Sequence, residues 1–415
     1  MLQLSKIISD GAGLNVSPIS KIMALADRKN IERLGIDPST VISFAGGWAA
    51  HDSPEGLRMQ YERISSDKNL FWQSGGYSLT EGSTELREQL VSLEKTLWGT
   101  NNLSPANFLV GHSGSQLTFS LVRALLDSGD TVLLFDPTYA HFYEQIHLIG
   151  GIKIETLPVF DPAVWSFKDE KKILEELRAK LEQKKPRLII FATPDNPTGH
   201  IFSDEFVKDV VSLAERANCY IALDYTYNIF YYTDSAPKHM SLDPEKYTNL
   251  VKIYSNSKWC RSLGRRLGWI IASPSVIGAV KLVQQAMMLC PDTLHQMALT
   301  EYLKRAIPSG ELERYTNKVR LKYKKAAQMT EACIDKHMGM RHTAIMGGLY
   351  SVVDVGMDGD KFVENVLKNT GVIFIPGKAF GKSLTSGIRV SFGPLIKKTN
   401  LIEEGFKRVA QYLKK

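Results

Sequence analysis

The amino-acid sequence predicts an α/β fold, with a large domain built on a mostly parallel sheet between helices and a smaller α+β domain. Two observations support this prediction. The middle of the 415-residue chain alternates short apolar runs with amphipathic segments, which is typical of β-α-β units. After about residue 285 the pattern changes to a long helical stretch, followed by short strand-like pieces and a final helix. The length of the chain also favours two domains.

The predicted strands of the large domain are rich in residues that suit burial on both faces of a sheet. The clearest of them are 132–135, 188–192, 220–223 and 250–254. Amphipathic segments at 171–181 and 203–216 predict helices between these strands. Ser203, followed by two acidic residues, is typical of a helix start, because the N-terminal end of the helix dipole favours negative charge.

The second domain is predicted from a helical stretch at about 286–336 and a helix from about residue 400. Between them we expect strands at 348–355, 371–375 and 387–392. Residues 1–45 contain short helical pieces, and we expect them to pack with this C-terminal part. The predicted division is an N-terminal segment over 1–45 that joins the small domain, a large domain over 46–289 and a small domain over 290–415.

Composition argues against several classes of protein. The excess of 51 basic over 44 acidic residues is mild and indicates a solvated surface rather than a nucleic-acid groove. No apolar run approaches the ~20 residues of a membrane helix, and the N-terminus shows no signal-peptide pattern. The four cysteines are widely spaced, without metal-type pairing, as in reduced cytoplasmic proteins. We therefore expect a cytoplasmic protein without a metal site and with neither nucleic-acid nor membrane partners.

The strongest chemical signal is the segment 255–269, Ser-Asn-Ser-Lys-Trp-Cys-Arg-Ser-Leu-Gly-Arg-Arg-Leu-Gly-Trp. Lys258 directly follows a predicted strand, and Ser255, Ser257 and Arg266 are suited to holding a phosphate. Positive charge nearby and desolvation lower the pKa of such a lysine, which makes its amine a nucleophile toward an aldehyde. The spacing Ser-x-Ser-Lys followed by Gly-x-Arg-x-Gly resembles the cofactor-lysine motif of the class I/II aminotransferases. These are pyridoxal 5′-phosphate (PLP) enzymes of fold type I.

The resemblance implies roles for residues that follow two other predicted strands. Asp224 matches the carboxylate that keeps the pyridine nitrogen of the cofactor protonated. Tyr227 matches the tyrosine that bonds the 3′-oxygen of the cofactor. Asn196, in Thr-Pro-Asp-Asn-Pro-Thr-Gly at 193–199, resembles the asparagine that contacts the same oxygen and helps to seat the substrate carboxylate.

A glycine- and serine-containing segment at 111–116, Gly-His-Ser-Gly-Ser-Gln, precedes an apolar helical run. Backbone N–H groups at a helix start form an anion site, although an ordinary helix cap has the same composition. Within the family pattern, Ser115 and Gln116 resemble the phosphate-loop residues. Tyr139, in Asp-Pro-Thr-Tyr, resembles the aromatic residue that stacks on the pyridine face.

Three further matches lie outside the central strands. Tyr77 matches a tyrosine that reaches the cofactor phosphate of the neighbouring subunit, so the resemblance implies a homodimer with shared active sites. Arg389 matches the arginine that grips the substrate α-carboxylate. Gly47 lies in the segment 44–52, which resembles the lip that closes over the substrate. Where the family pattern has Gly-Gly-x-Pro-x-Pro, Ala49 and His51 replace the prolines, and this departure bears on any substrate assignment.

The resemblance, which covers the chain from about residue 15 onward, implies a PLP-dependent aminotransferase. Such an enzyme moves an amino group between an L-amino acid and a 2-oxo acid, with Lys258 forming a Schiff base and then acting as general base. The same residues also serve PLP-dependent lyases, cyclases and oxidases of amino acids, so that alternative stays open. A non-catalytic regulator would carry a DNA-binding domain, for which there is no room before Gly46. The motifs do not select a substrate side chain, and Trp48 fits either an apolar wall near the substrate or a core position.

Overall fold

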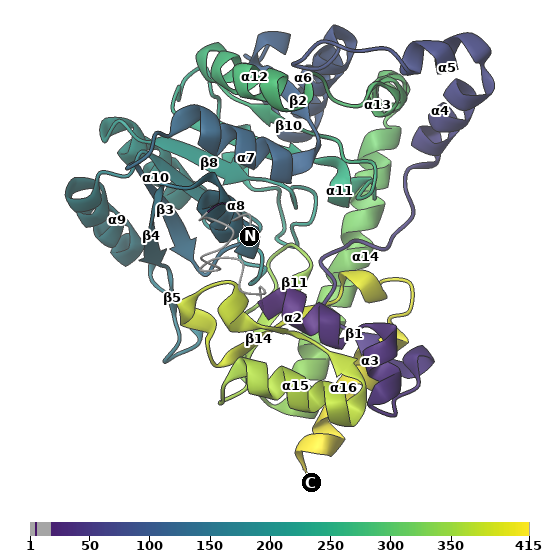
Figure 1. The fold of residues 1–415 in the computed structure, drawn as a ribbon, viewed down its shortest axis with the longest axis vertical. Coiled ribbons are helices and arrows are strands. Elements are labelled where there is room, and N and C mark those ends of the chain that lie inside the picture. Colours follow the sequence, from purple (N-terminus) through teal and green to yellow (C-terminus); the bar gives the residue numbers. More distant parts are fainter. Residues whose placement is uncertain (1–4, 6–17, 415) are drawn as a thin grey trace.

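The computed structural model describes residues 5 and 18–414, and its largest element is a seven-stranded sheet (Figure 1). The strand order is β2 (Phe108–Gly111), β10 (Gly268–Ile271), β9 (Leu250–Ser255), β8 (Tyr220–Asp224), β7 (Leu188–Ala192), β3 (Thr131–Asp136) and β4 (Lys153–Pro158). Strand β10 is antiparallel to β2 and β9, whereas the remaining neighbours are parallel. The predicted α/β class and the mostly parallel sheet are confirmed.

Helices cover both faces of this sheet, because successive side chains of a strand point to opposite faces. On one face, Leu134 and Ile190 join a buried apolar cluster with α7 (Ser113–Leu125), α8 (Ala140–Ile149) and α12 (Pro274–Met288). On the other face, Leu133 and Ile189 belong to a second cluster with α6 (Thr84–Trp98), α9 (Glu170–Lys184) and α10 (Asp204–Arg216). The predicted start of α10 is confirmed, since the Ser203 hydroxyl accepts a hydrogen bond from the Phe206 backbone N–H at 3.1 Å.

A three-stranded antiparallel sheet lies in the lower part of Figure 1, in the order β11 (Tyr350–Asp354), β14 (Gly387–Ser391) and β13 (Ile375–Pro376). Helices α15 (Gly359–Thr370) and α16 (Asn400–Leu413) pack beside it. Early residues reach the same region, because β1 (Ile42–Ser43) pairs in parallel with β12 (Val372–Ile373). Helices α2 (Pro18–Leu25) and α3 (Arg28–Arg33) also lie there, while residues 1–4 and 6–17 of the predicted N-terminal segment lie outside the described residues.

The single helical stretch expected at 286–336 is wrong, because the structure has α12 ending at Met288, α13 (Thr293–Ala306) and α14 (Glu311–Cys333). Pro291 and Pro308, each lacking a backbone N–H, lie at the two breaks. Asp292 then caps α13 by accepting a hydrogen bond from the His295 N–H at 2.8 Å. Helix α13 packs on α4 (Glu55–Ser66) and α6, whereas α14 runs on toward α16. The division of the chain at residue 289 stays a prediction.

Two further helices are α5 (Lys68–Ser74) and the four-residue α11 (Asn256–Trp259), which contains Lys258. A two-stranded ribbon of β5 (Phe160–Asp161) and β6 (Ser166–Phe167) is separate from the larger sheets. Among the described residues, none of the helices combines the length and apolar character needed to cross a bilayer.

Candidate active site

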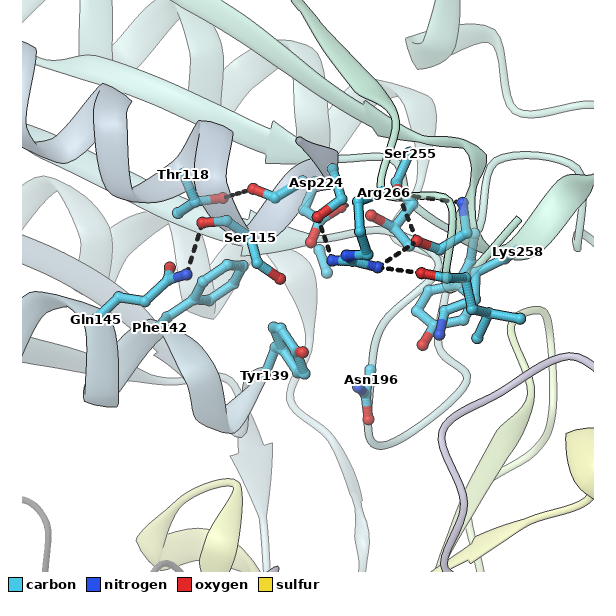
Figure 2. A pocket seen from close by; sticks show the side chains of 17 residues that line it. Ser115, Thr118, Tyr139, Phe142, Gln145, Asn196, Asp224, Ser255, Lys258 and Arg266 are labelled. Atoms are coloured by element: carbon cyan, nitrogen blue, oxygen red, sulfur yellow. Dashed lines mark hydrogen bonds between the residues drawn. The ribbon is translucent and has the colours of Figure 1, made fainter. Parts of the chain in front are cut away.

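A pocket lies where the carboxyl ends of β7, β8 and β9 meet the first turn of α7 (Figure 2). Ligands bind at this edge of open parallel sheets. Most of the sequence-predicted site residues line this pocket together: Ser115, Tyr139, Asn196, Asp224, Tyr227, Ser255, Ser257, Lys258 and Arg266. Figure 2 shows Tyr139 and Asn196 across the cavity from Ser255 and Arg266. The structure therefore gathers side chains that are widely separated in the sequence.

The part of the pocket beside α7 presents hydrogen-bond donors that suit an anion, and it is called the anion site below. The Arg266 guanidinium donates hydrogen bonds to the Ser113 hydroxyl and, at 3.4 Å, to the Ser257 hydroxyl. The Ser255 hydroxyl donates to that of Ser257 at 2.9 Å. The backbone N–H groups of the first turn of α7 complete a set of donors suited to a phosphate. Sequence analysis missed Ser113, whose backbone adopts a left-handed φ of 73° at the start of the helix.

Close packing behind this anion site requires a glycine. A Cβ added at Gly268 would lie 2.6 Å from the Tyr254 carbonyl oxygen and 3.0 Å from the Ser113 Cα. Both neighbours are backbone atoms that hold β9 and the start of α7 in place. The second glycine of the Gly-x-Arg-x-Gly pattern is therefore explained by the approach of β10 to the anion site.

Lys258 lies on α11, directly after β9, and its side chain extends into the pocket. The Nζ atom donates a hydrogen bond to the Gly47 carbonyl and lies 5.7 Å from the centre of the Tyr227 ring. Burial, followed by the charges of Arg389 and Arg266, lowers the pKa of Lys258 to about 8, against a smaller opposing effect of Asp224. A substantial fraction of the amine is therefore neutral near pH 7 to 8, the form that attacks an aldehyde.

Asp224 ends β8 on the floor of the pocket. Its carboxylate accepts a hydrogen bond from the Thr226 backbone N–H at 2.8 Å. Burial raises the pKa of Asp224, whereas the bonds from Thr226 and the charge of Lys258 lower it. A buried carboxylate is stabilised in its charged form by a cationic partner. A ligand with a protonated ring nitrogen would therefore fit this side of the pocket.

Tyr227 and Arg389 are joined through Tyr350, which sequence analysis missed. The hydroxyls of Tyr227 and Tyr350 lie 2.6 Å apart, and the Arg389 guanidinium stacks 4.6 Å from the centre of the Tyr350 ring. Arg389 donates to the Asn196 side-chain oxygen at 3.1 Å and to the Ala45 carbonyl at 2.6 Å. Its Nε has no hydrogen-bond partner among the described residues. A buried guanidinium with donors to spare is suited to a carboxylate.

Four sequence-predicted residues do not join the pocket lining. The Gln116 side chain accepts from the His112 N–H at 2.8 Å and donates to the Ser120 hydroxyl at 2.8 Å and to the Gln284 side-chain oxygen at 3.3 Å, so it braces α7 and ties it to α12. Tyr77 is 87% exposed and stands away from the pocket of its own chain. Gly47 and Arg389 are not pocket-lining residues either, but they reach it through Lys258 and Asn196. Thr118, Phe142 and Gln145, from α7 and α8, line the deep end and were also missed.

Among the described residues, metal-ligating side chains do not gather near this pocket. Across residues 5 and 18–414, there is no group of three or more His, Cys, Asp or Glu side chains that could hold a metal ion.

Comparisons with known proteins cover nearly the whole chain. Residues 63–403 match the model of the family described as aminotransferase class I and II. An aspartate aminotransferase of Thermotoga maritima is 29% identical over 399 residues, which are 95% of this chain and 97% of that protein. The aromatic-amino-acid aminotransferase 2 of Thermococcus litoralis is 24% identical over 404 residues, with coverage of 97% and 96%.

Solved structures show the same fold. The crystal structure of the Thermotoga maritima aspartate aminotransferase superposes with a TM-score of 0.82 at 26% identity and covers 99% of this chain and 100% of that chain. A mutant aspartate aminotransferase of Thermus thermophilus gives a TM-score of 0.84 at 22% identity with the same coverage. The arrangement of the seven-stranded sheet and the smaller three-stranded sheet is therefore a fold that these solved structures share.

Proposed function

Because the chain belongs to the class I and II aminotransferases and is a transaminase of that class, we propose that it binds PLP through Lys258. We propose that it moves an amino group between an L-amino acid and a 2-oxo acid. The observation that carries this proposal is the convergence of three features in one pocket. They are an anion site around Arg266, a lysine whose pKa is lowered to about 8, and the buried Arg389, which reaches the pocket through Asn196.

The donor set of the pocket fits PLP. The hydroxyls beside Arg266 and the start of α7 would hold the phosphate, Asp224 would face the ring nitrogen, and Tyr139 would lie against the ring. Tyr227, held by Tyr350, and Asn196 would bond the 3′-oxygen. When bound, the cofactor supplies a positively charged ring that accepts the electron pair left after α-proton removal.

The chain's own residues would bind the substrate and move its proton. Arg389 is already oriented by Asn196 and by the Ala45 carbonyl, so its remaining donors would take the α-carboxylate in two hydrogen bonds. The neutral amine of Lys258 would accept the α-proton and return it to a neighbouring carbon. Buried aromatic rings around Arg389 would keep water from these charges, which strengthens the hydrogen bonds to the substrate.

The alternative of a PLP-dependent lyase, cyclase or oxidase is not favoured. The relatives described above are named as aspartate and aromatic-amino-acid aminotransferases, and their names span acidic and aromatic substrates. We therefore propose an L-amino acid and a 2-oxo acid as partners, without assigning the side chain.

We propose that the protein is a homodimer with shared active sites. Tyr77 is fully available to a second copy, and Ser78 and Thr80 bond to Pro291 and Gln284, so the loop lies against α12 and the start of α13. Large apolar side chains are exposed on these elements and on α5: Phe71, Trp72, Leu79, Leu282, Met287 and Leu289. An exposed apolar surface of this kind supports association with another protein surface.

We also propose a cytoplasmic location and the three-part division over 1–45, 46–289 and 290–415. The cysteines Cys219, Cys260, Cys290 and Cys333 are all free, which fits a reducing compartment. The separate sheets and the long α14 between them support a division of the chain into two bodies.

The proposed reaction is tested by mixing the purified protein with a panel of amino acids while recording its visible absorption, with Lys258→Ala as control. A bound-cofactor band that one amino acid converts to the amine form, and that a 2-oxo acid restores, supports transamination. Spontaneous return of the band with release of ammonia would favour the lyase or oxidase alternative. A wild-type protein without such a band after PLP is added would refute the cofactor assignment.

The shared site is tested by co-expressing Lys258→Ala and Tyr77→Ala chains with different tags and isolating the hybrid. One of its two sites then combines an intact Lys258 with an intact Tyr77 from the other chain. The hybrid should be more active than either parent dimer. Activity no higher than that of the Tyr77→Ala parent would contradict the shared site.

A further inference from the structure

His51, in the lip, stands where the family pattern has a proline. A proline stiffens the backbone, whereas His51 holds the lip through hydrogen bonds of its side chain. The imidazole is 3% exposed and forms two hydrogen bonds. Its Nδ1 lies 3.0 Å from the Tyr323 hydroxyl of α14, and its Nε2 lies 3.1 Å from the Trp259 carbonyl oxygen of α11. The ring thus joins the lip to the residue that directly follows Lys258.

The direction of each hydrogen bond follows from the chemistry of the partners. A carbonyl oxygen only accepts, so Nε2 carries the proton. Burial lowers the pKa of His51 to about 4, with further lowering by Arg261 and Lys322 against an opposing effect of Asp52, so the ring is neutral at pH 7. Nδ1 is then an acceptor, and the Tyr323 hydroxyl donates to it.

The Tyr323 oxygen has one further role, because it accepts a hydrogen bond from the Ala50 backbone N–H at 3.1 Å. A continuous relay therefore runs from the Ala50 N–H through Tyr323 and His51 to the Trp259 carbonyl. Every member of the relay is satisfied with a neutral imidazole in a single tautomer. Polar networks that are fully satisfied in a buried setting hold one geometry.

The other end of the lip touches the proposed catalytic groups. The Gly47 carbonyl accepts from Lys258, the Ala45 carbonyl accepts from Arg389 at 2.6 Å, and the Gly46 carbonyl accepts from the Ser391 hydroxyl at 2.6 Å. The lip is therefore attached near Lys258 by the amine at Gly47 and by the following backbone at His51. The Tyr315 hydroxyl adds to the second attachment, because it lies 2.8 Å from the Asp52 carbonyl oxygen and 3.2 Å from the Trp259 carbonyl oxygen. Figure 1 shows this stretch, between β1 and α4, passing beside α14.

We propose that His51 is a positioning residue that fixes the lip against the Lys258 segment by bridging Tyr323 and the Trp259 carbonyl. The proposal rests on the proposed function, in which Lys258 is the reacting amine and Arg389 takes the substrate carboxylate. His51 contacts neither reacting group itself. It holds residues 46–51 at the distance from Lys258 and Arg389 that substrate binding needs, a task that prolines perform through backbone stiffness.

Three variants of the two relay residues and one matched control test this role. His51→Phe keeps ring volume but removes both hydrogen bonds, whereas His51→Gln keeps a donor that reaches toward the Trp259 carbonyl. Tyr323→Phe removes only the hydroxyl and so covers the case in which His51→Phe fails to fold. Tyr302→Phe is the control, since Tyr302 is also buried and its hydroxyl has no partner among the described residues.

The first readout is hydrogen–deuterium exchange of the lip peptide in the purified full-length protein, with and without added PLP. We expect exchange over 46–52 to be about tenfold faster in His51→Phe and in Tyr323→Phe, intermediate in His51→Gln and unchanged in Tyr302→Phe. The second readout is steady-state kinetics. The KM for the amino acid should rise about tenfold in His51→Phe and Tyr323→Phe, rise less in His51→Gln and stay unchanged in Tyr302→Phe. The kcat should change less than the KM, since a displaced lip weakens substrate binding more than it slows the chemical step.

The outcomes separate this proposal from its premise. Exchange and KM that match the Tyr302→Phe control in both relay variants would refute the positioning role. Faster exchange spread over the whole protein, with the KM unchanged, would show a merely structural histidine and would also refute it. A wild-type protein that loads no PLP counts against the proposed function alone, because the exchange comparison needs neither cofactor nor substrate to reveal the tether.

Discussion

Replacing Arg389 by lysine isolates the value of its planar, forked donors, because the positive charge stays while the geometry changes. Arg389 is 4% exposed and lies between the rings of Tyr350 and Phe380, whose centres are 4.6 and 4.8 Å from its Cζ atom. Asn196 and the Ala45 carbonyl orient it from one side. A lysine amine offers a single point charge to a carboxylate that would otherwise receive two parallel hydrogen bonds.

The magnitude follows from the loss of one hydrogen bond to a charged group, which is about 1.5–3 kcal/mol. At about 1.4 kcal/mol per factor of ten, Arg389→Lys should lower kcat/KM by roughly 10- to 150-fold. Most of the change should appear as a higher KM, because the carboxylate is held both before and during the reaction. Steady-state rates at a saturating concentration of the 2-oxo acid measure both constants.

Arg341→Lys is the matched control. Arg341 precedes the same small sheet, binds Asp354 at 2.6 Å and is 54% exposed, so the same substitution there should leave kcat/KM within about twofold of wild type, as surface changes do. The reasoning is refuted if Arg389→Lys behaves like Arg341→Lys, or if it lowers kcat while the KM stays at the wild-type value.

Three other expectations follow from buried charges. In cofactor-free protein, the rate of Lys258 acylation should rise with pH around a midpoint near 8, because burial and the neighbouring arginines lower the pKa of the amine. Peptide mass spectrometry measures the acylated fraction. A midpoint near 10.5 would contradict this cause. Lys21 is the internal comparison, since its bond to Glu364 raises its pKa. Asp224→Asn should lower kcat about 100- to 1,000-fold while PLP still binds, as absorption titration would show; unchanged turnover would count against its role. Lys252→Met leaves the buried carboxylate of Glu94, 2.9 Å from the Lys252 Nζ, without its cationic partner, so the free energy of unfolding in denaturant should fall by about 3–5 kcal/mol. The loss should be smaller when Glu94 is replaced by an apolar residue in the same protein.

The sheet and the anion site were readable in the sequence because their signals are local. The apolar runs became β3, β7, β8 and β9, and Ser255, Ser257, Lys258 and Arg266 occupy one short segment that folds onto itself. The direction of a side chain on a helix depends on which elements pack against that helix, and a short sequence segment does not reveal this packing. Gln116 follows Ser115 directly, yet it points to Ser120 and Gln284, where the packing of α7 against α12 takes it.

Contacts made across long sequence separations were missed for a related reason. Tyr350 meets Tyr227 from 123 residues away, and no pattern around either residue encodes their hydroxyl contact. His51 was visible as a departure from the family pattern, but its partners Tyr323 and Trp259 lie on two other elements. The continuous helix predicted across 286–336 was wrong because that prediction followed helical periodicity alone, whereas Pro291 and Pro308, which lack a backbone N–H, lie at the two breaks.

The path of the chain through the site sets an order in time during synthesis. Ala45, whose carbonyl accepts a hydrogen bond from Arg389, is synthesised first, and the residues around Lys258 follow. Arg389 is synthesised about 130 residues after Lys258, or roughly 7–26 s later at typical elongation rates. The large sheet has all its strands by Ile271, and every residue that lines the pocket precedes Leu267, so this part of the site is synthesised in full well before Arg389. Under the roles proposed for Lys258 and Arg389, the cofactor end of the site is therefore synthesised before the substrate end.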